Sequence, residues 1–535
     1  MPAPAPIYFG DAGARLFGWV HQPGQHARPT AVVLCNPLGD DYVRAHRSLR
    51  HLAEDLCAAG FPVLRFDFHG TGDSAGNERD PGRLAAWRRD LGTAIDELRR
   101  QSGAAKVAVV GLRLGATIAA EVASQRDDVA SVVLWHPFID GSSFTSETLR
   151  MHRMHRMLEP KSFAAGPTEY ADGEEALGFF LTKETIADLE RVDLMTLPRR
   201  PAPHVLVIGA ANVPAEGPLQ ERLRALGAEV TYRHLPGHKF LISIPHRSTV
   251  PQDVIDAIVG WLADTHSTLD ATAPRSVPRP DRHEASQFVE EPLVFGTTHR
   301  LFGILVKPVR DRARSDLPAI IMINAGTVHR IGPHRLYVEL ARELAELGFH
   351  VLRMDLSGIG DSPVASGDEN LTYPATGLAD CQAAMTALGE RVGAQRFIFA
   401  GLCSGADITF QLGVKDDRVA GVVMMNPLTF CVQDPAFVEG YKGARYYQNT
   451  FFNKWSWLRL LRGEVDLVRV AKMLAPKVKG LAARVVDRVR PITNGGDDHA
   501  DVPAYLRMMA ERGIDTFLVV TEHDPGVDYV DVHFG

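Results

Sequence analysis

The feature that most constrains this chain of 535 residues is an internal repeat. The run FPVLRFDFHGTGDSAG at Phe61–Gly76 returns as FHVLRMDLSGIGDSPV at Phe349–Val364, and KVAVVGLRLGA at Lys106–Ala116 returns as RFIFAGLCSGA at Arg396–Ala406. The runs keep the same order and nearly the same offset in both halves. A repeat of this size is a whole domain and not one turn of a solenoid, so we predict two similar domains.

The predicted domains are 1–265 and 286–535, and the segment 266–285, rich in Pro, Arg, Ser and Thr, is predicted to be an extended linker. Within each half, short apolar runs such as AVVLC alternate with amphipathic stretches such as HRSLRHLAEDLCAAG. This alternation is typical of βαβ units, in which helices flank a buried, mostly parallel sheet. The predicted fold class is therefore α/β.

Each half also contains a strand, a sharp turn bounded by small residues, and a helix. The turn is GLRLG at Gly111–Gly115 in the first half and GLCSG at Gly401–Gly405 in the second. This is the pattern of a nucleophile elbow. Small residues are needed because the turn packs its helix tightly against neighbouring strands, while the middle side chain is raised at the helix N-terminus. Backbone N–H groups there can stabilise an oxyanion or a thiolate.

The elbows, together with the upstream run D-x-x-G-x-G-D-S, resemble the α/β-hydrolase superfamily and, more narrowly, its serine aminopeptidase-like (S33) branch. The first half, with GLRLGA, is similar to type 2 hydrolases of exosortase A systems, and the second, with GLC-x-x-A, to their type 1 relatives. The resemblance covers nearly the whole chain outside the linker and the cap inserts. It implies two tandem α/β-hydrolase domains and a cell-envelope or exopolysaccharide locus, without a defined reaction.

The repeat alignment makes Cys403 the predicted nucleophile of the second half, because it has small residues two positions to either side, whereas Ser404 would have Leu402. A thiolate attacks thioesters, lactones and activated esters well, and peptide amides less well. The alternative is that Cys403 is a small buried filler on a degenerate elbow. The predicted oxyanion hole combines the N–H of Ser404 with one from the loop that contains Ala325 and Gly326.

The loop after a late strand of this fold supplies the acid of the triad, and here we expect Asp524, with Glu522 as second choice. Ordinary turn chemistry for Asp-Pro-Gly is the alternative. Three further side chains follow the oxyanion loop and could bind an anionic group of the substrate, or could be surface charges and caps: His329, Arg330 and Arg335.

The triad histidine of the family follows one more helix and strand, and the second half ends at Gly535 before that stretch. We therefore expect the second domain to lack its C-terminal part. The chain could be truncated, a local histidine (His523, His533 or His329) could substitute, or this half could be inactive.

The first half has Arg113 at the nucleophile position, and guanidinium stays protonated, so it is no nucleophile. The acid position offers Asn212, with Glu216 nearby, while His238 stands where the family has its histidine. A cation at a helix N-terminus needs a buried acidic partner or an anionic ligand to compensate it. Either this half is an inactive, stabilising domain, or Arg113 and His238 bind an anion.

Cap inserts are predicted at about 138–203 and 430–515, and the second is aromatic and basic, with twelve Lys or Arg against three Asp or Glu between Tyr441 and Arg490. Such a lid could accept an acyl chain on an acidic carrier or touch a membrane surface, or it could be a solvated helical face. Nucleic-acid binding is not expected, since no recognised module is present.

Bulk composition adds few constraints. A net charge of −7, five cysteines and no evident leader or apolar span favour a cytoplasmic protein with reduced thiols. The stretch Gly70–Gly76 lacks dinucleotide-binding spacing, and the sequence has no metalloprotease helix motif, Walker A loop or paired CxxC, so neither a cofactor nor a metal is expected. The predicted function is an acyl hydrolase or acyltransferase for small thioester or ester substrates. The alternative is a pair of inactive domains that act as a binding or scaffold protein.

Overall fold

The computed structural model describes ten stretches of the chain. They are residues 2–24, 27–158, 169–209, 216–235, 245–266, 282–297, 299–314, 316–365, 367–430 and 502–521. The described residues form two compact units, a larger one that runs up to Phe397 and a smaller one that begins at Ile398. The larger unit contains the first repeat and the beginning of the second.

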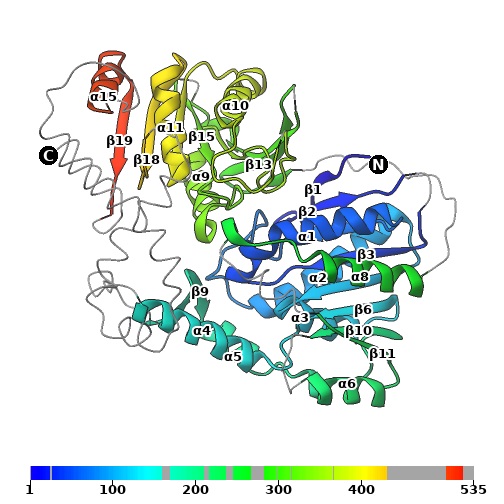
Figure 1. The fold of residues 1–535 in the computed structure, drawn as a ribbon. Helices are drawn as coiled ribbons and strands as arrows, with labels where there is room; N and C mark the ends of the chain where they lie inside the picture. Colours follow the sequence, from blue (N-terminus) through cyan, green and yellow to red (C-terminus); the bar gives the residue numbers. More distant parts are fainter. Residues whose placement is uncertain are drawn as a thin grey trace, which may run out of the picture. The chain divides into compact units, whose positions relative to one another are not determined.

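The first repeat is built on a sheet of eight strands in the order β1-β2-β4-β3-β5-β6-β10-β11 (Figure 1). Strands β1 and β2 form an antiparallel hairpin, β2 pairs antiparallel with β4, and the remaining pairs are parallel. The strands are β1 (Ala5–Phe9), β2 (Leu16–His21), β3 (Thr30–Cys35), β4 (Val63–Phe66), β5 (Lys106–Leu112), β6 (Val129–Trp135), β10 (His204–Gly209) and β11 (Glu229–His234).

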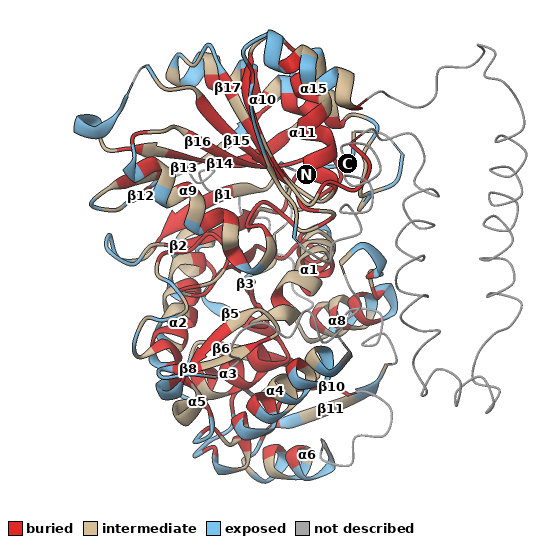
Figure 2. Ribbon diagram, turned by 90° about the vertical axis from the view of Figure 1, so that its left-hand side faces the viewer, coloured by how far each residue is buried: buried red, intermediate tan, exposed pale blue. Residues whose placement is uncertain are grey.

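Helices cover both faces of this sheet, because its central strands are apolar on both sides. One face packs against α1 (Asp40–Ala58) and α8 (Gln252–Thr265), and the other against α2 (Arg83–Ser102), α3 (Leu114–Ala123) and α6 (Glu216–Ala225). Figure 2 shows the resulting contrast between buried central strands and the more exposed edge strand β11. The predicted α/β class with a mostly parallel sheet is confirmed.

The cap of the first repeat follows β6. It consists of helix α4 (Gly141–Leu158), a small antiparallel sheet and helix α5 (Lys183–Leu189), and it ends in the 3-10 turn η2 (Leu194–Thr196). The strands of the small sheet are β7 (Glu169–Tyr170), β8 (Gly173–Ala176) and β9 (Phe179–Thr182).

The second repeat supplies strands to both units. In the larger unit they run in the order β12-β13-β14-β16-β15, with antiparallel pairs from β12 to β16 and a parallel pair between β16 and β15. They are β12 (His283–Glu284), β13 (Phe288–Phe295), β14 (Leu301–Pro308), β15 (Ala319–Ile323) and β16 (Val351–Asp355), with helices α9 (Leu336–Glu346) and α10 (Gly377–Val392).

The smaller unit continues the same pattern with strands in the order β17-β18-β19. Helix α15 packs on α11 through contacts such as the Phe410–Tyr505 ring pair, so the described end of the predicted insert 430–515 belongs to the layer that covers the sheet. The elements are β17 (Phe397–Leu402), α11 (Ser404–Lys415), β18 (Val419–Met425), α15 (Val502–Glu511) and β19 (Asp515–Val519).

Candidate functional site

The two elbows have the same backbone. Arg113 lies between β5 and α3 with φ 56° and ψ −125°, and Cys403 lies between β17 and α11 with φ 59° and ψ −121°. The N–H of each donates to the last residue of the next strand, Trp135 or Met425, at 2.9 Å. A positive φ at a residue with a side chain costs of order 1–3 kcal/mol and persists only where the surroundings enforce it.

The flanking glycines explain why this conformation is enforced. A Cβ on Gly111 would overlap the backbone of Ala116, one on Gly115 would overlap the backbone of Asn36, and one on Gly401 would overlap the backbone of Gly405. The small residues thus let the strand, the turn and the helix approach one another closely, which is the reason the sequence pattern predicts.

Cys403 presents a half-buried thiol at the start of α11, and Ser404 behind it is buried. One turn further, the buried carboxylate of Asp407 accepts N–H bonds from Leu428, Thr429 and Phe430 at 2.8–3.0 Å. This carboxylate fixes the loop that follows β18, and with it the residues that lead away from the elbow.

The strand order of the smaller unit suits a triad. Strand β19 lies two places from β17 and runs parallel to β18, and the N–H of Thr521 at its end donates to the side chain of Asn426 at 2.9 Å. The chain after β19 therefore starts at the same sheet edge as the elbow. The predicted acids Asp524 and Glu522, and the candidate histidines His523 and His533, lie outside the described residues.

In the larger unit, the predicted oxyanion loop is held by Asn324. Its side-chain amide donates to the carbonyl of Val328 at 2.9 Å and to Asp355 at 3.1 Å, and its oxygen accepts the N–H of Leu356 at 2.7 Å. Ala325 is buried and Gly326 has a φ of 59°. The pairing of this loop with Ser404 stays a prediction.

The elbow of the first repeat is occupied by an ion-pair cluster. The Arg113 guanidinium, 8% exposed, lies 3.1 Å from the carboxylate of Asp41, contacts Glu147 of the cap, and stacks on Phe138 at 4.2 Å. Burial alone would lower the pKa of Arg113, but the two carboxylates raise it. Of the two kinds of compensation expected, acidic partners are present, although both carboxylates are partly exposed and not buried, and the cation joins the start of α1 to the cap helix.

The structure describes only some of the remaining candidate residues of the first repeat. Next to the elbow, burial and the charge of Arg113 lower the pKa of His136 to about 4. Asn212 and His238 lie outside the described residues, and only the backbone of Glu216 is described, as the first residue of α6. Anion binding by Arg113 with His238 therefore stays a prediction, although both carboxylates already contact the guanidinium.

The three candidates for an anionic substrate group, His329, Arg330 and Arg335, all make contacts between the repeats. Arg330, 1% exposed, pairs with Asp73 at 2.7 Å and with Asp355 and Asp361 at 2.8 Å. Its carboxylate partners are protein groups, so this guanidinium is already satisfied within the fold.

The other two candidates are equally buried. His329 stacks on its neighbour from the first repeat, His46, at 4.0 Å, and burial followed by the charge of His46 lowers its pKa well below the ordinary value. Arg335 donates to three backbone carbonyls of the first repeat, those of Gly72, Ser74 and Gly76, at 2.5–2.9 Å. Binding of a substrate by these three residues stays a prediction.

Sequence reasoning missed a reciprocal exchange of charges between the repeats. Arg353 of the second repeat contacts Asp73 of the first at 2.5 Å, and Arg65 of the first contacts Asp361 of the second at 2.5 Å. Arg65 and Arg353 occupy the same position in the two copies of the repeated run, and so do Asp73 and Asp361. The signal was present, since each copy of the run carries an arginine and an aspartate, and a pseudo-twofold relation lets the arginine of each copy pair with the aspartate of the other.

The rest of the repeated run is local structure. In each repeat the first aspartate, Asp67 or Asp355, accepts the N–H of the last one, and the serine hydroxyl donates back to the carbonyl of the first at 2.6–2.7 Å. Together these bonds stabilise a tight turn, so nucleotide binding is not needed to account for the repeated run.

Two negative findings apply to the described stretches of the chain. They contain no group of three His, Cys, Asp or Glu side chains arranged to hold a metal ion. No helix among them is both long enough and apolar enough to cross a bilayer. The basic part of the second cap, 441–490, lies outside these stretches.

Comparison with known proteins gives one family match that covers more than half of the chain. Residues 28–170 and 319–479 match the family described as serine aminopeptidase, S33. A lysophosphatidylserine lipase of Gallus gallus, ABHD12, is 32% identical over 99 residues, which are 17% of this chain and 26% of that lipase. The match therefore spans about a quarter of the length of the lipase.

Solved structures cover half of the chain. Est1E from Butyrivibrio proteoclasticus is 14% identical with a TM-score of 0.35, over 49% of this chain and 99% of its own. Proline iminopeptidase from Mycobacterium smegmatis is 14% identical with a TM-score of 0.33, over 50% of this chain and 99% of its own.

Proposed function

Because the chain belongs to the serine aminopeptidase S33 family of α/β-hydrolases, whose members are hydrolases, we propose that it is an acyl hydrolase that acts through Cys403. Its substrates are thioesters or activated esters, and an acyltransferase with a second acceptor in place of water is the same chemistry. The resemblance to exosortase-associated hydrolases extends the proposal to substrates of cell-envelope or exopolysaccharide metabolism.

One observation carries the proposal: Cys403 has the backbone of a nucleophile elbow and a half-buried thiol at the start of a helix of twelve residues. The positive end of the helix dipole favours the thiolate over the thiol. The thiol is thus raised at the helix start, where this fold places its nucleophile.

The proposed reaction has two steps. The thiolate of Cys403 forms a bond to the carbonyl carbon of the substrate, the bond to the leaving thiolate or alkoxide breaks, and the leaving group takes a proton from water. Water then attacks the acyl-enzyme and the bond from the acyl carbon to Cys403 Sγ breaks, which releases the carboxylate and two protons and restores the thiolate. Where the leaving group took a proton from water in the first step, one of these protons neutralises the hydroxide left behind. The N–H of Ser404 and one from Ala325–Gly326 would stabilise the oxyanion in both steps.

The test is hydrolysis of S-(4-nitrophenyl) thiobutyrate by the full chain, followed by the absorbance of the released thiolate. We expect Cys403→Ala to lower kcat/KM by at least about 100-fold, as the loss of a covalent nucleophile does. Cys381→Ala is the matched control, because Cys381 is a fully buried thiol on α10 of the same repeat. Equal rates for Cys403→Ala and the unchanged chain would end the proposal.

A second candidate is a binding or scaffold protein without catalysis, which the ion-pair cluster around Arg113 favours for the first repeat. This candidate predicts no acyl-enzyme. Mass spectrometry of the full chain after brief mixing with the thioester separates the two, since an adduct of one butyryl group that is absent in Cys403→Ala belongs only to the enzyme.

A further inference from the structure

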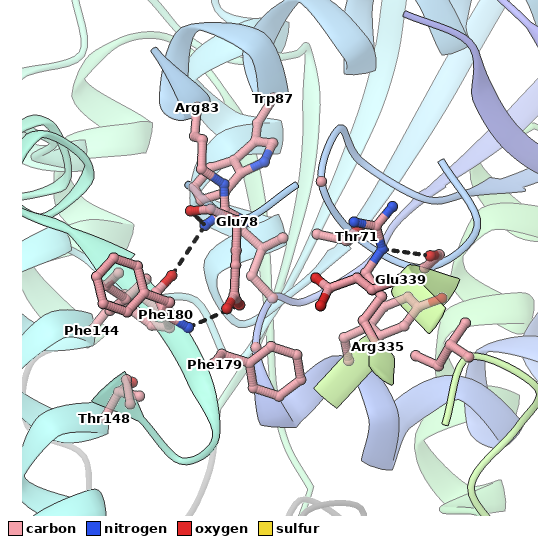
Figure 3. Close-up of a pocket in the computed structure, with 18 residues that line it drawn as sticks. Thr71, Glu78, Arg83, Trp87, Phe144, Thr148, Phe179, Phe180, Arg335 and Glu339 are labelled. Carbon is pink, nitrogen blue, oxygen red and sulfur yellow. Dashed lines mark hydrogen bonds between the residues drawn. The ribbon is translucent and has the colours of Figure 1, made fainter. Parts of the chain in front are cut away.

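Residues 324–335 of the second repeat contain the predicted oxyanion loop, and within the larger unit they pack against the first repeat. Arg330 pairs with Asp73 of the first repeat at 2.7 Å. Arg335 donates to three backbone carbonyls of the turn that follows β4, and Figure 3 shows Arg335 with one of these bonds as a dashed line. Neither arginine changes its charge near neutral pH, because a guanidinium stays protonated there.

One contact of this segment can respond to pH. The ring of His329 stacks on that of His46 from helix α1, with centroids 4.0 Å apart and an angle of 12° between the planes. His329 is 2% exposed, and the side chain of His46 is 12% exposed. Two neutral imidazoles can stack face to face, whereas two charged ones repel each other at this distance. The stack therefore tolerates at most one positive charge.

The charged groups around the stack leave little negative charge for a proton on His329. Asp361 lies 3.5 Å from Nε2 of His46, but the same carboxylate also pairs with Arg65 at 2.5 Å and with Arg330 at 2.8 Å. On the other side, Nε2 of His329 lies 3.4 Å from the Tyr42 hydroxyl, which donates to a carboxylate at 2.8 Å. The remaining titratable or charged groups near the pair are His21, Arg50, Asp67, Asp73 and Asp355.

These surroundings fix the direction in which His329 responds to acid. Burial lowers its pKa well below the ordinary value, the charges of His46 and Arg330 act in the same direction, and Asp361 acts against them. When the segment opens to water, the pKa of His329 returns to about 6.5. Because the closed state has the lower pKa, its advantage is complete above pH 6.5 and is lost as the pH falls below that value.

Asp67, which lies beside the stack, acts in the opposite direction. Burial, followed by the charge of Asp73, raises the pKa of Asp67 to about 6, so the closed state takes up a proton as the pH falls through 6. Its hydrogen bonds come from the Tyr42 hydroxyl and from the backbone of Asp73, both of the first repeat. Opening of a segment of the second repeat therefore changes the surroundings of Asp67 less than those of His329.

We propose that the His46–His329 stack is an acid-sensitive clasp through which the first repeat holds the oxyanion loop of the second repeat. In the closed state both rings are stacked, and in the open state a charged His329 leaves α1 and residues 324–335 become accessible to water. The repeat that has arginine in place of a nucleophile thereby controls a part of the other repeat. The effect on catalysis rests on the proposed function, whereas the clasp itself can be tested without turnover.

The test is hydrogen–deuterium exchange of the full chain at pH 7 and pH 5, with protection corrected for the intrinsic exchange rate. The N–H groups of Arg330 and Gly332 report the closed state, because they donate to Asp355 at 2.6 Å and to the carbonyl of His329 at 3.0 Å. His329→Phe keeps an aromatic ring that cannot be protonated. Between pH 7 and pH 5, we expect protection to fall about 20-fold more in the unchanged chain than in this variant. Asp67 is present in both chains and drops out of the ratio, so equal pH dependence in the two chains would overturn the proposal.

Two further variants and one assay complete the test. His204→Gln is the matched control, because this imidazole on β10 is 40% exposed and pairs with Glu229, and it should keep the pH dependence of the unchanged chain. If His329→Phe does not fold, His329→Gln replaces it, since its amide can contact the Tyr42 hydroxyl and does not titrate. Thioester hydrolysis is measured separately. Absent turnover together with the expected ratio refutes only the proposed hydrolase, whereas turnover with equal pH dependence of exchange refutes only the clasp.

Discussion

The two elbows differ in one side chain and hardly at all in backbone. Arg113 and Cys403 have φ and ψ values within 4° of each other, and both donate their N–H to the adjacent strand at 2.9 Å. Around Arg113, however, the larger unit supplies two carboxylates and an aromatic ring. In the other elbow the thiol of Cys403 is half-buried at the helix start.

This comparison teaches that the strained turn does not depend on catalysis. Glycines that bring strand and helix together enforce the positive φ, and a residue of any chemistry can then be placed there. In the first repeat the position has become a structural ion pair, while the second has a thiol. The geometry of the elbow therefore identifies the residue at the nucleophile position. Whether that residue can react depends on the chemistry of its side chain.

The largest expected change in the free energy of unfolding tests whether the two ion pairs between the repeats contribute equally to stability. Asp73→Asn and Asp361→Asn each remove the carboxylate that faces a buried arginine, Arg353 or Arg65, which should lower the unfolding free energy by about 3–5 kcal/mol. Urea denaturation measures both, with the exposed Asp172→Asn as a control that should change little. A cost at only one of the two aspartates would contradict the reciprocal exchange.

The next effect tests the shared turn. Gly111→Ala and Gly401→Ala place a Cβ against backbone atoms, so each should lower the unfolding free energy by about 1–3 kcal/mol. Gly217→Ala, where no atom lies within 4 Å of the new Cβ, is the control. Comparison of urea midpoints shows whether both elbows are equally tight, and a neutral result at either glycine would mean that its turn can relax.

A smaller effect is expected from the ion-pair cluster of the first elbow. Arg113→Met leaves Asp41 and Glu147 without their cation, but both are partly exposed to water, so the cost should be about 1 kcal/mol. Thermal melting measures it. In the Cys403→Ala chain, Arg113→Cys should not restore thioester hydrolysis, because the two carboxylates face the new thiol and disfavour its anion. Restored turnover would show that the first repeat needs only a nucleophile.

The last test concerns pH at the contact between α1 and the second repeat. Burial would raise the pKa of Glu369, but the hydrogen bond from His51 and the charges of Arg50 and Arg47 lower it to about 2. Since the unfolded value is about 4.3, its stabilisation is present above that pH and is lost as the pH falls toward 2. Melting temperatures of the chain and of Glu369→Gln should therefore differ at pH 6 and converge near pH 2. A difference in melting temperature that stays the same from pH 6 to pH 2 would show that the ionisation of Glu369 does not contribute to stability.

Several parts of this picture could be predicted from local sequence because the physics that fixes them is local. The alternation of apolar runs and amphipathic helices set the α/β class, and small residues at Gly111, Gly115 and Gly401 located both turns. The expectation that Arg113 needs an acidic partner followed from its place at a helix start. The identity of that partner did not, because Asp41 and Glu147 lie 72 and 34 residues away.

The charged residues after the oxyanion loop show where local reasoning ends. His329, Arg330 and Arg335 follow a loop that suggests contact with a substrate, yet they contact the first repeat some 260 to 290 residues earlier in the chain. The aspartates that pair with Arg330 were visible in the sequence as acidic positions of the repeated run, whereas the partners of His329 and Arg335 were not. Nothing in the spacing of that run told which arginine would meet which aspartate.

The sequence by itself determined that the chain has two copies of one fold and that Cys403 and Arg113 stand at the two elbows, since repeat order and the packing of small residues are properties of the linear pattern. Only the tertiary structure decided that the arginine and the aspartate of each copy of the repeated run pair with those of the other copy. The physical reason is that a buried charge is stabilised by whichever group packing brings within a few ångströms of it, and packing joins segments that are distant along the chain.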